Sequence, residues 1–394
     1  MSNDKLPDGW KRVKFKEIAA SITERVDDPA RSGVERYVGL EHLDPDSTTI
    51  RRWGSPNDVE ATKLRFYPGD VIYGRRRAYQ RKLGVADFDG ICSAHALVLR
   101  AKPDICLPEF LPYFLQSDSF HQRALDISVG SLSPTINWKT LAVQEFALPP
   151  AEEQQQIVDT LDSCGNWQDR LLSTLRSTAD VRSAMLNELD NASSRRCRLG
   201  DLVELERGVS YKSSDYVGEG EGRPFLNLKC VSRRGTFSNR GVKWVRPDFA
   251  TANVASAGEL FFANTDLTPG RLLVGAPFFF RGLQHDAEPC FSMDLTRVRL
   301  LRSDLPLEIV YHLLNIPRVR SQMRALTGGS TVGHLRLGSV PDIQVPIVTE
   351  PEYVLVKLRS LEAVEGALEV LLSGSRDIAR SLRERLLAGG EHVQ

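Results

Sequence analysis

The sequence predicts an α+β protein in which two globular modules occur in tandem repeat and are joined by two long helices that form an antiparallel coiled coil. Three observations predict this fold class. The chain of 394 residues is long enough for two domains with separate cores. Its second half repeats the outline of its first half, and each repeat ends in a stretch of helical periodicity roughly forty residues long. The alternative is that both helices belong to the core of one large domain.

Composition narrows the class of protein. The 51 basic and 51 acidic residues cancel, which excludes a uniformly basic nucleic-acid coat but leaves room for local basic patches. No apolar window of about 18 residues is present, and the N-terminus lacks the apolar core of a signal peptide, so we expect no membrane segment. The six scattered cysteines include no C-x-x-C pair, which favours a reduced cytoplasmic protein without structural zinc.

The repeat is clearest at the helix starts. A shift of 197 residues pairs Pro149 with Pro346, Glu153 with Glu350 and Leu161 with Leu358. Earlier segments match in the same order at slightly different offsets: "YPGDVIY" (67–73) matches "SAGELFF" (256–262), and "GSLSPTI" (130–136) matches "GSTVGHL" (329–335). The predicted boundaries are 1–149 for the first module, 150–192 for the first helix, 193–348 for the second module, 349–389 for the second helix, and 390–394 for a tail.

Both long helices carry apolar residues at alternating steps of three and four, the spacing of a coiled-coil seam. Pro149 and Pro150 mark the first helix start, because proline fits a first turn but not a helix interior, and Glu153 and Gln154 follow them. A narrow stripe on so long a helix needs a partner helix, and the other copy is the obvious one. The predicted seam residues are Ile157, Leu161, Leu171, Leu175, Met185, Leu189, Val354, Leu358, Leu361, Leu368, Leu372, Leu382 and Leu386.

Each module also contains a local concentration of positive charge. Residues 63–82 hold seven basic residues against one acid, and residues 223–246 hold seven against none. Arginine and lysine neutralise phosphates, and arginine, glutamine and asparagine can read base edges, so we expect nucleic-acid contacts here. The alternative is an ordinary solvated surface. The candidate contacts are Arg75, Arg76, Arg77, Tyr79, Gln80, Arg81 and Lys82, then Lys212, Arg233, Arg234, Asn264, Thr265 and Arg271, and the hydroxyl residues Ser131, Ser133, Ser330 and Thr331.

The search for catalytic motifs is negative. The sequence has no H-E-x-x-H, no P-loop, no G-x-S-x-G and no Asn-Pro-Pro-aromatic tetrapeptide of the amino-methyltransferases, and its seven histidines show no ligand spacing. The pattern is that of a protein that recognises a partner and does no chemistry.

Four motifs in order resemble one known family. They are "LPDGW" (6–10), "VKFKEIA" (13–19), "YPGDVIY" and "LPPAEEQQQIV" (148–158), and together they resemble the specificity subunit of type I restriction–modification systems. The resemblance covers nearly the whole chain. One departure is the second helix start, "VPIVTEPEYV" (345–354), which lacks the second proline and the Glu-Gln pair.

The resemblance implies a division of labour. The modules would be target-recognition domains, each reading one half of a bipartite site in double-stranded DNA. The helices would set the spacer and dock two modification (methyltransferase) subunits and, through them, restriction/translocase subunits. The docking residues would include Pro149, Pro150, Glu153 and Gln154 at the start of the first helix. The chain would bind no cofactor or metal itself, since S-adenosylmethionine would be held by the methyltransferase, which extrudes the target base from the stack.

Three alternatives remain open at this point. The chain could be a coiled-coil adaptor that binds only protein, a stand-alone nuclease or methyltransferase with an unrecognised motif, or the specificity component of a related phage-defence system. Salt-dependent DNA affinity separates the first from a DNA reader, and activity without partners identifies the second.

Overall fold

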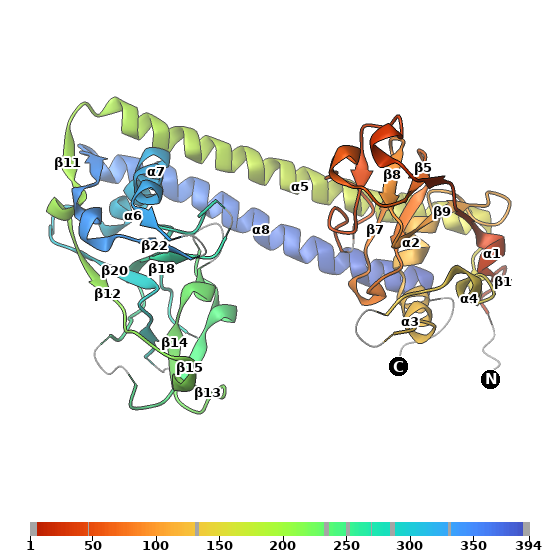
Figure 1. The fold of residues 1–394 in the computed structure, drawn as a ribbon. Helices are drawn as coiled ribbons and strands as arrows, with labels where there is room; N and C mark the ends of the chain where they lie inside the picture. Colours follow the sequence, from red (N-terminus) through yellow and green to blue (C-terminus); the bar gives the residue numbers. More distant parts are fainter. Residues whose placement is uncertain are drawn as a thin grey trace. The chain divides into compact units, whose positions relative to one another are not determined.

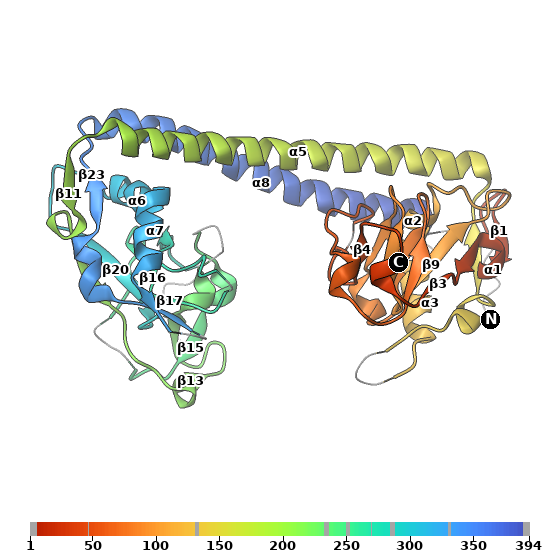
Figure 2. The same ribbon diagram turned by 45° about the horizontal axis from the view of Figure 1, so that its top comes forward.

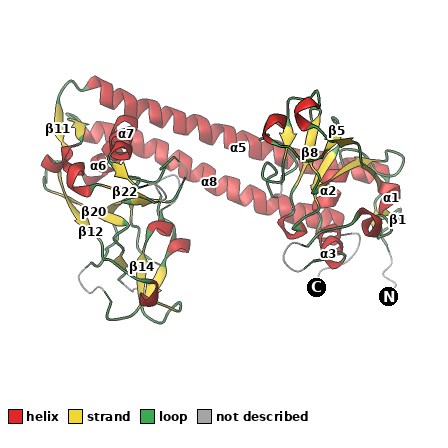
Figure 3. Cartoon of the chain, in the orientation of Figure 1, coloured by secondary structure: helices red, strands yellow, loops and turns green. Residues whose placement is uncertain are grey.

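The computed structural model describes residues 6–45, 47–130, 134–231, 236–249, 253–268, 270–283, 288–329 and 332–388. These residues divide into two units. Unit 1 comprises residues 1–172 and 370–394, and unit 2 comprises residues 173–369. The mixed helix and strand content that the sequence predicts is confirmed (Figure 3).

Two small four-stranded sheets form the framework of unit 1. One has the strand order β2-β9-β6-β7 and the other β3-β5-β8-β4, and a separate pair joins β1 antiparallel to β10. The strands are β1 (Lys11–Lys14), β2 (Ala19–Ile22), β3 (Arg25–Val26), β4 (Tyr37–Val38), β5 (Lys63–Phe66), β6 (Val71–Gly74), β7 (Leu83–Val85), β8 (Gly90–Ser93), β9 (Ala96–Ala101) and β10 (Glu145–Leu148).

The short helices of unit 1 pack around an aromatic core. They are α1 (Phe15–Ile18), α2 (Leu111–Gln116), α3 (Asp118–Asp126) and α4 (Trp138–Leu141). The ring centroids of Phe114 and Phe146 are 5.3 Å apart, and those of Phe120 and Phe146 are 5.4 Å apart. Ile157 and Leu161 of the long helix α5 (Ala151–Ala192) belong to the same buried cluster, so the start of α5 is part of the unit 1 core.

Unit 2 also contains two four-stranded sheets and a separate antiparallel pair. One four-stranded sheet has the order β12-β20-β16-β18, the other β13-β15-β14-β19, and β11 pairs antiparallel with β23. A further three-stranded sheet, β17-β22-β21, is formed in this unit. The strands are β11 (Arg196–Arg198), β12 (Val203–Arg207), β13 (Tyr216–Val217), β14 (Arg223–Leu226), β15 (Lys243–Val245), β16 (Leu260–Ala263), β17 (Thr265–Asp266), β18 (Pro277–Phe279), β19 (Cys290–Phe291), β20 (Leu295–Leu300), β21 (Thr327–Gly328), β22 (Gly333–Leu335) and β23 (Gln344–Pro346).

Helices α6 (Leu307–Asn315) and α7 (Pro317–Ala325) pack on the first of these sheets (Figure 2). Leu313 and Val319 share one buried cluster with Phe262 of β16. Leu186 of α5 and Leu358 of the second long helix, α8 (Pro351–Leu387), belong to the same cluster. Unit 2 therefore takes its helical support from the end of α5 and the start of α8.

The two long helices lie alongside each other within each unit (Figure 1). In unit 1, Gln168 Nε2 of α5 donates to the carbonyl oxygen of Ser375 of α8 at 3.2 Å. In unit 2, Arg182 Nε of α5 lies 3.0 Å from Glu365 Oε1 of α8. Every residue that we predicted for the seams is buried or partly buried, whereas most residues between them are exposed.

No helix in the described ranges is long and apolar enough to cross a membrane. Within the same ranges, no group of three or more His, Cys, Asp or Glu residues could hold a metal ion.

Candidate nucleic-acid interface

The candidate interface of unit 1 begins with residues 75–82, here called the basic loop, which connects β6 to β7. A β-bridge joins Arg76 to Thr135, and the backbone N–H of Arg77 donates to the carbonyl oxygen of Pro134 at 2.9 Å. The backbone N–H of Ile136 in turn donates to the carbonyl oxygen of Arg75 at 3.0 Å. The structure therefore brings the basic loop against residues 134–136, the described end of "GSLSPTI". Ser131 and Ser133 lie outside the described residues.

The candidate side chains of the basic loop separate into two groups. Arg81 pairs with Asp118, and Lys82 Nζ donates to the carbonyl oxygen of Leu40 at 2.9 Å, so both are engaged within unit 1. Arg76, Arg77 and Tyr79 are exposed, and Arg75 and Gln80 are partly buried. The exposed group is the part of the loop that is free to meet a ligand.

The electrostatic environment of the loop is positive. Arg76 Nη1 lies 3.4 Å from His95 Nε2. The pKa of His95 is lowered by burial and then by the neighbouring charges of Arg76 and Arg75. Arg75 and Arg76 thus place positive charge next to His95 at the edge of the basic loop, which suits a polyanion.

The backbone of the basic loop is unusual at two arginines. Arg77 and Arg81 have φ values of 55° and 48°, in the left-handed region. The other non-glycine residue with positive φ in the described ranges is Arg271, with φ 53°, in the corresponding loop of unit 2. This conformation costs about 1 to 2 kcal/mol for a residue with a Cβ atom, and such strain persists where the surrounding structure and function require it.

In unit 2 the corresponding connection is residues 264–276, here called the long loop, which leads from β16 to β18 through β17. Asn264 and Thr265, which we predicted as DNA contacts, are both 3% exposed. Asn264 Nδ2 donates to the carbonyl oxygen of Met293 at 3.0 Å, and Thr265 Oγ1 donates to Asp294 Oδ1 at 3.0 Å. The structure thus places both in the interior, where they hold the base of the long loop.

A buried carboxylate organises the rest of the long loop. Asp266 is 1% exposed and accepts hydrogen bonds from the backbone N–H groups of Thr268 at 2.6 Å and Val274 at 3.3 Å. Burial acts to raise the pKa of Asp266, but these hydrogen bonds outweigh it and lower the pKa. Leu267 and Leu272 remain 66% and 53% exposed at the surface of the loop.

Two arginines border the long loop. Arg271 Nη1 donates to the carbonyl oxygen of Thr327 at 2.8 Å, and its Nη2 donates to that of Gly329, which ties the loop to the segment before β22. Arg320 Nη2 donates to the carbonyl oxygen of Leu272 at 2.8 Å, while its Nη1 is buried with no hydrogen-bond partner in the described structure. Burial and the neighbouring Arg324 lower the pKa of Arg320 to about 10. This partly buried positive charge is a feature that the sequence analysis missed.

The remaining unit 2 candidates are more dispersed. The side chain of Lys212 is exposed and follows Tyr211, whose hydroxyl donates to Asp294 Oδ2 at 2.9 Å. Because Thr265 bonds to the same carboxylate, the segment of Lys212 lies beside the start of the long loop. Arg233, Arg234, Ser330 and Thr331 lie outside the described residues.

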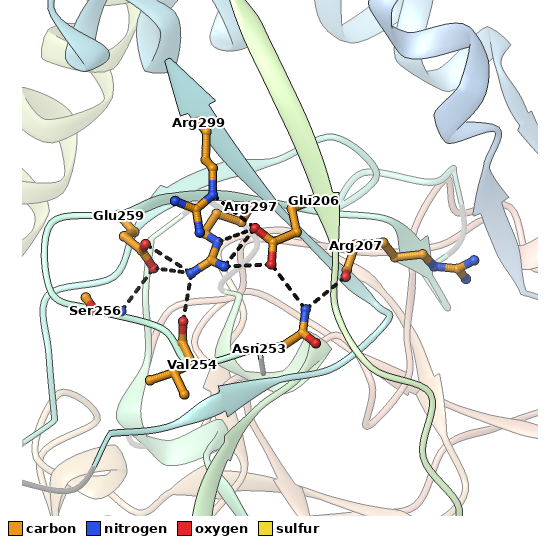
Figure 4. Close-up of polar contacts among 8 residues, drawn as sticks. All are labelled: Glu206, Arg207, Asn253, Val254, Ser256, Glu259, Arg297 and Arg299. Carbon is orange, nitrogen blue, oxygen red and sulfur yellow. Dashed lines mark hydrogen bonds and ion pairs between the residues drawn. The ribbon is translucent and has the colours of Figure 1, made fainter. Parts of the chain in front are cut away.

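The opposite ends of β6 and β16 carry structural ion pairs. Asp70, directly before β6, is fully buried and accepts from Arg100 Nε at 2.7 Å. Directly before β16, Glu259 lies 3.0 Å from Arg297 Nη1. Figure 4 shows the wider network, in which Glu206 accepts from Arg297 at 2.6 Å and from Arg299 at 3.0 Å. The charges of Asp70, Glu259 and Glu206 are paired within their own units. The loops at the other ends of β6 and β16 are therefore the candidate surfaces for DNA.

The helix start that we predicted as a docking site is also used internally. Gln154 is 1% exposed, and its amide accepts from the backbone N–H of Leu107 at 2.8 Å and donates to the carbonyl oxygens of Ile105 and Pro149, both at 2.9 Å. Glu153 accepts from Trp10 Nε1 at 3.0 Å. These contacts fasten α5 to the preceding module, with Pro149 and Pro150 at the junction.

A second apolar column, absent from the sequence analysis, runs along the exposed side of both long helices. On α8 it comprises Val364, Leu371 and Ile378, at 47%, 51% and 60% exposure. Steps of seven residues keep these side chains on one face of the helix. On α5, Trp167 and Val181, each 51% exposed, stand at the positions equivalent to Val364 and Ile378 under the shift of 197 residues. We call these five residues the exposed column.

The comparisons with known proteins agree with this arrangement. Residues 7–178 match the family model of the type I restriction modification DNA specificity domain. The chain is 26% identical over 207 residues to the specificity subunit of the type I restriction enzyme EcoDI from Escherichia coli. That match covers 50% of this chain and 43% of the relative. A match to the putative type I restriction enzyme MjaX specificity subunit of Methanocaldococcus jannaschii is 23% identical and covers 68% of this chain and 72% of the relative.

Solved structures show the same fold over the full length. The S subunit of a type I restriction–modification system from M. genitalium aligns with a TM-score of 0.54 at 15% identity, covering 98% of both chains. A chain from a study of assembly and conformational transition of the type I R-M system aligns with a TM-score of 0.55 at 22% identity, again over 98% of both chains. Residues 7–178 are therefore similar to the type I restriction modification DNA specificity domain, and the chain as a whole shares the fold of these solved structures.

Proposed function

We propose that this chain is the sequence-specific DNA-recognition subunit of a type I restriction–modification complex and performs no chemistry of its own. Its two modules, 1–149 and 193–348, act as target-recognition domains in tandem, and each reads one half of a bipartite site in double-stranded DNA. The repeated order of sheets and helices in the two units supports this division.

One observation carries the proposal. In each unit, the loop that follows the equivalent strand, β6 or β16, pairs with an equivalent later segment, through Thr135 in unit 1 and His334 in unit 2. Both loops present large exposed side chains beside arginines. Placing loops of different length on one framework gives each module a different recognition surface. That is the arrangement a protein needs to read two unlike half-sites, because loops vary while the framework stays constant.

The long helices act as an antiparallel coiled coil that sets the spacer between the half-sites. Their exposed column docks two methyltransferase subunits, and restriction/translocase subunits join through them. The 197-residue equivalence of Trp167 with Val364 and of Val181 with Ile378 supports two equivalent docking sites. The methyltransferase subunit binds S-adenosylmethionine, and this chain only positions that subunit on the target DNA.

The test is DNA binding by the chain assembled with its methyltransferase subunits. Affinity for a duplex that carries the target site should fall log-linearly as the salt concentration rises from about 50 to 200 mM, because phosphate contacts release counterions. Replacing Arg76 by alanine should make this slope shallower. An assembled complex without salt-dependent affinity for DNA would favour the protein-only adaptor, and activity of the chain without partners would favour a stand-alone enzyme.

A further inference from the structure

Three arginines share the left-handed backbone conformation, and the structure explains two of them. Arg81 pairs with Asp118 and lies 4.0 Å from Glu384, so its side chain fastens α3 and the end of α8 to the basic loop. Arg271 donates to two backbone carbonyl oxygens of the segment before β22. In both cases the guanidinium group stabilises the unit, which offsets the strained backbone.

Among the described residues, no side-chain contact explains the strained backbone of Arg77. Its side chain is exposed and makes no hydrogen bond or ion pair with any residue that the structure describes. Its backbone, in contrast, is fixed on both sides: its N–H donates to the carbonyl oxygen of Pro134 at 2.9 Å, and its own carbonyl oxygen accepts from Gln80 N–H at 2.9 Å. Glycine or asparagine would adopt this conformation with less strain.

We propose that Arg77 reads a guanine base in the half-site bound by unit 1, an inference that rests on the proposed function. A fixed backbone sets the direction in which the side chain leaves the loop. A fixed direction is of little use to a phosphate contact, for which charge and reach suffice and an unstrained lysine would serve. It is what a planar, two-pronged contact to the O6 and N7 atoms of guanine requires.

The surroundings of Arg77 suit this assignment. Arg76 and the partly buried Arg75 precede it and place further positive charge beside it, which suits contacts with DNA phosphates. Tyr79, two residues later, is 54% exposed. Within the described structure, Arg77 is the one arginine of the basic loop that combines a left-handed backbone with an exposed side chain.

The experiment measures binding of the assembled complex to duplexes in which every base pair of the unit 1 half-site is substituted in turn. The wild-type complex should prefer guanine at one position, and Arg77→Asn should reduce that preference by about 5- to 150-fold, the range for one bidentate contact. Arg77→Lys should also lose it, because lysine retains the charge but not the planar fork. A uniform loss of affinity for all duplexes, or full rescue by lysine, would identify a phosphate contact and overturn the proposal.

A stability measurement separates reading from a structural role. Arg77→Gly should leave the thermal midpoint unchanged or raise it, whereas the matched variant Arg271→Gly should lower it by removing two hydrogen bonds to carbonyl oxygens. A lower midpoint for Arg77→Gly would contradict the inference. If the wild-type complex itself shows no base preference at any position, the proposed function fails. If the wild-type complex shows a preference and the Arg77 variants retain it, the inference alone fails.

Discussion

Gln154 fastens the first long helix to its module through a single buried amide. All three of its hydrogen bonds go to backbone groups of unit 1, and two of these, on Ile105 and Leu107, lie in the connection before α2. The helix start is therefore fixed by these three hydrogen bonds, here called the Gln154 lock, as well as by apolar packing. The second copy has proline at the equivalent position, 351, and lacks this lock.

We predict that Gln154→Ala destabilises unit 1 by about 2 to 4 kcal/mol, because it removes three hydrogen bonds and leaves buried backbone groups unsatisfied. Denaturant unfolding of the full chain measures the loss. The control is the neighbour Gln155→Ala, whose exposed side chain bonds only to Asp159 one turn later and should cost no more than about 0.5 kcal/mol. Equal effects of the two substitutions would show that Gln154 is not a lock.

Asp190 has the corresponding place in unit 2, at the end of α5. It lies 2.8 Å from Arg318 Nε and also pairs with Arg196. The hydrogen bond from Arg318 is the main cause that lowers the pKa of Asp190, assisted by Arg196 and opposed by burial. A carboxyl group whose pKa is lower in the folded protein stabilises it above the ordinary pKa and loses that contribution as the pH falls through the folded value.

Unit 2 should therefore lose stability as the pH falls below about 4, the ordinary range of an aspartate. At pH 7, Asp190→Asn should cost about 1 to 2 kcal/mol, since both arginines are partly exposed and their charges are screened. The same variant should show a smaller acid-induced decline than the wild type. Free energies of unfolding measured from pH 7 to below about pH 4 test this prediction. An equal loss of stability in the wild type and the Asp190→Asn variant over this range would contradict it.

At the scale of elements, the apolar periodicity of the two long helices could be predicted, although the buried residues Val158, Leu186 and Leu355 lie outside the predicted seams. Steps of three and four recur along the chain, so a periodic pattern read from the sequence identifies the face that is buried in the structure. The loops could not be predicted in this way. Asn264 and Arg77 are both polar residues after a strand, yet one is buried and the other exposed, and only the turn geometry distinguishes them.

The exposed column illustrates a second limit. A sequence search for one coiled-coil seam identifies the apolar residues with that spacing and ignores the apolar residues on other faces of the helix. Val364, Leu371 and Ile378 become conspicuous only when the burial of the seam shows that they lie on another face. Gln154 and Glu153 illustrate the reverse, because the sequence marks them as prominent but does not reveal that their partners are internal.

We predict that the double variant Leu371→Ser and Ile378→Ser abolishes co-purification with the methyltransferase subunit. Its thermal midpoint should stay close to that of the wild type, because both side chains are exposed in the chain alone. Val370→Ser is the matched control: Val370 is 72% exposed on the same helix but on a different face, so association should persist. Retained association in the double variant would remove the exposed column from the docking surface.

At the scale of the whole molecule, repetition is the property from which the function follows. Equivalent sheets in the two units carry different connections, a compact basic loop in unit 1 and a longer loop organised by Asp266 in unit 2. A protein built this way should recognise two dissimilar sequences at once. The sequence could indicate the repetition and the presence of positive loops, but the bases each loop selects depend on contacts that no local pattern encodes.

The most direct measurement is a map of methylated bases in DNA from cells that carry this chain with its methyltransferase subunit, compared with cells that lack only this chain. The account predicts an asymmetric adenine-methylation motif in two parts, separated by an unspecified spacer, that disappears when the chain is removed. Methylation that is unchanged by its removal, or the absence of any two-part motif while both proteins are expressed, would contradict the claim that this chain directs a methyltransferase to DNA.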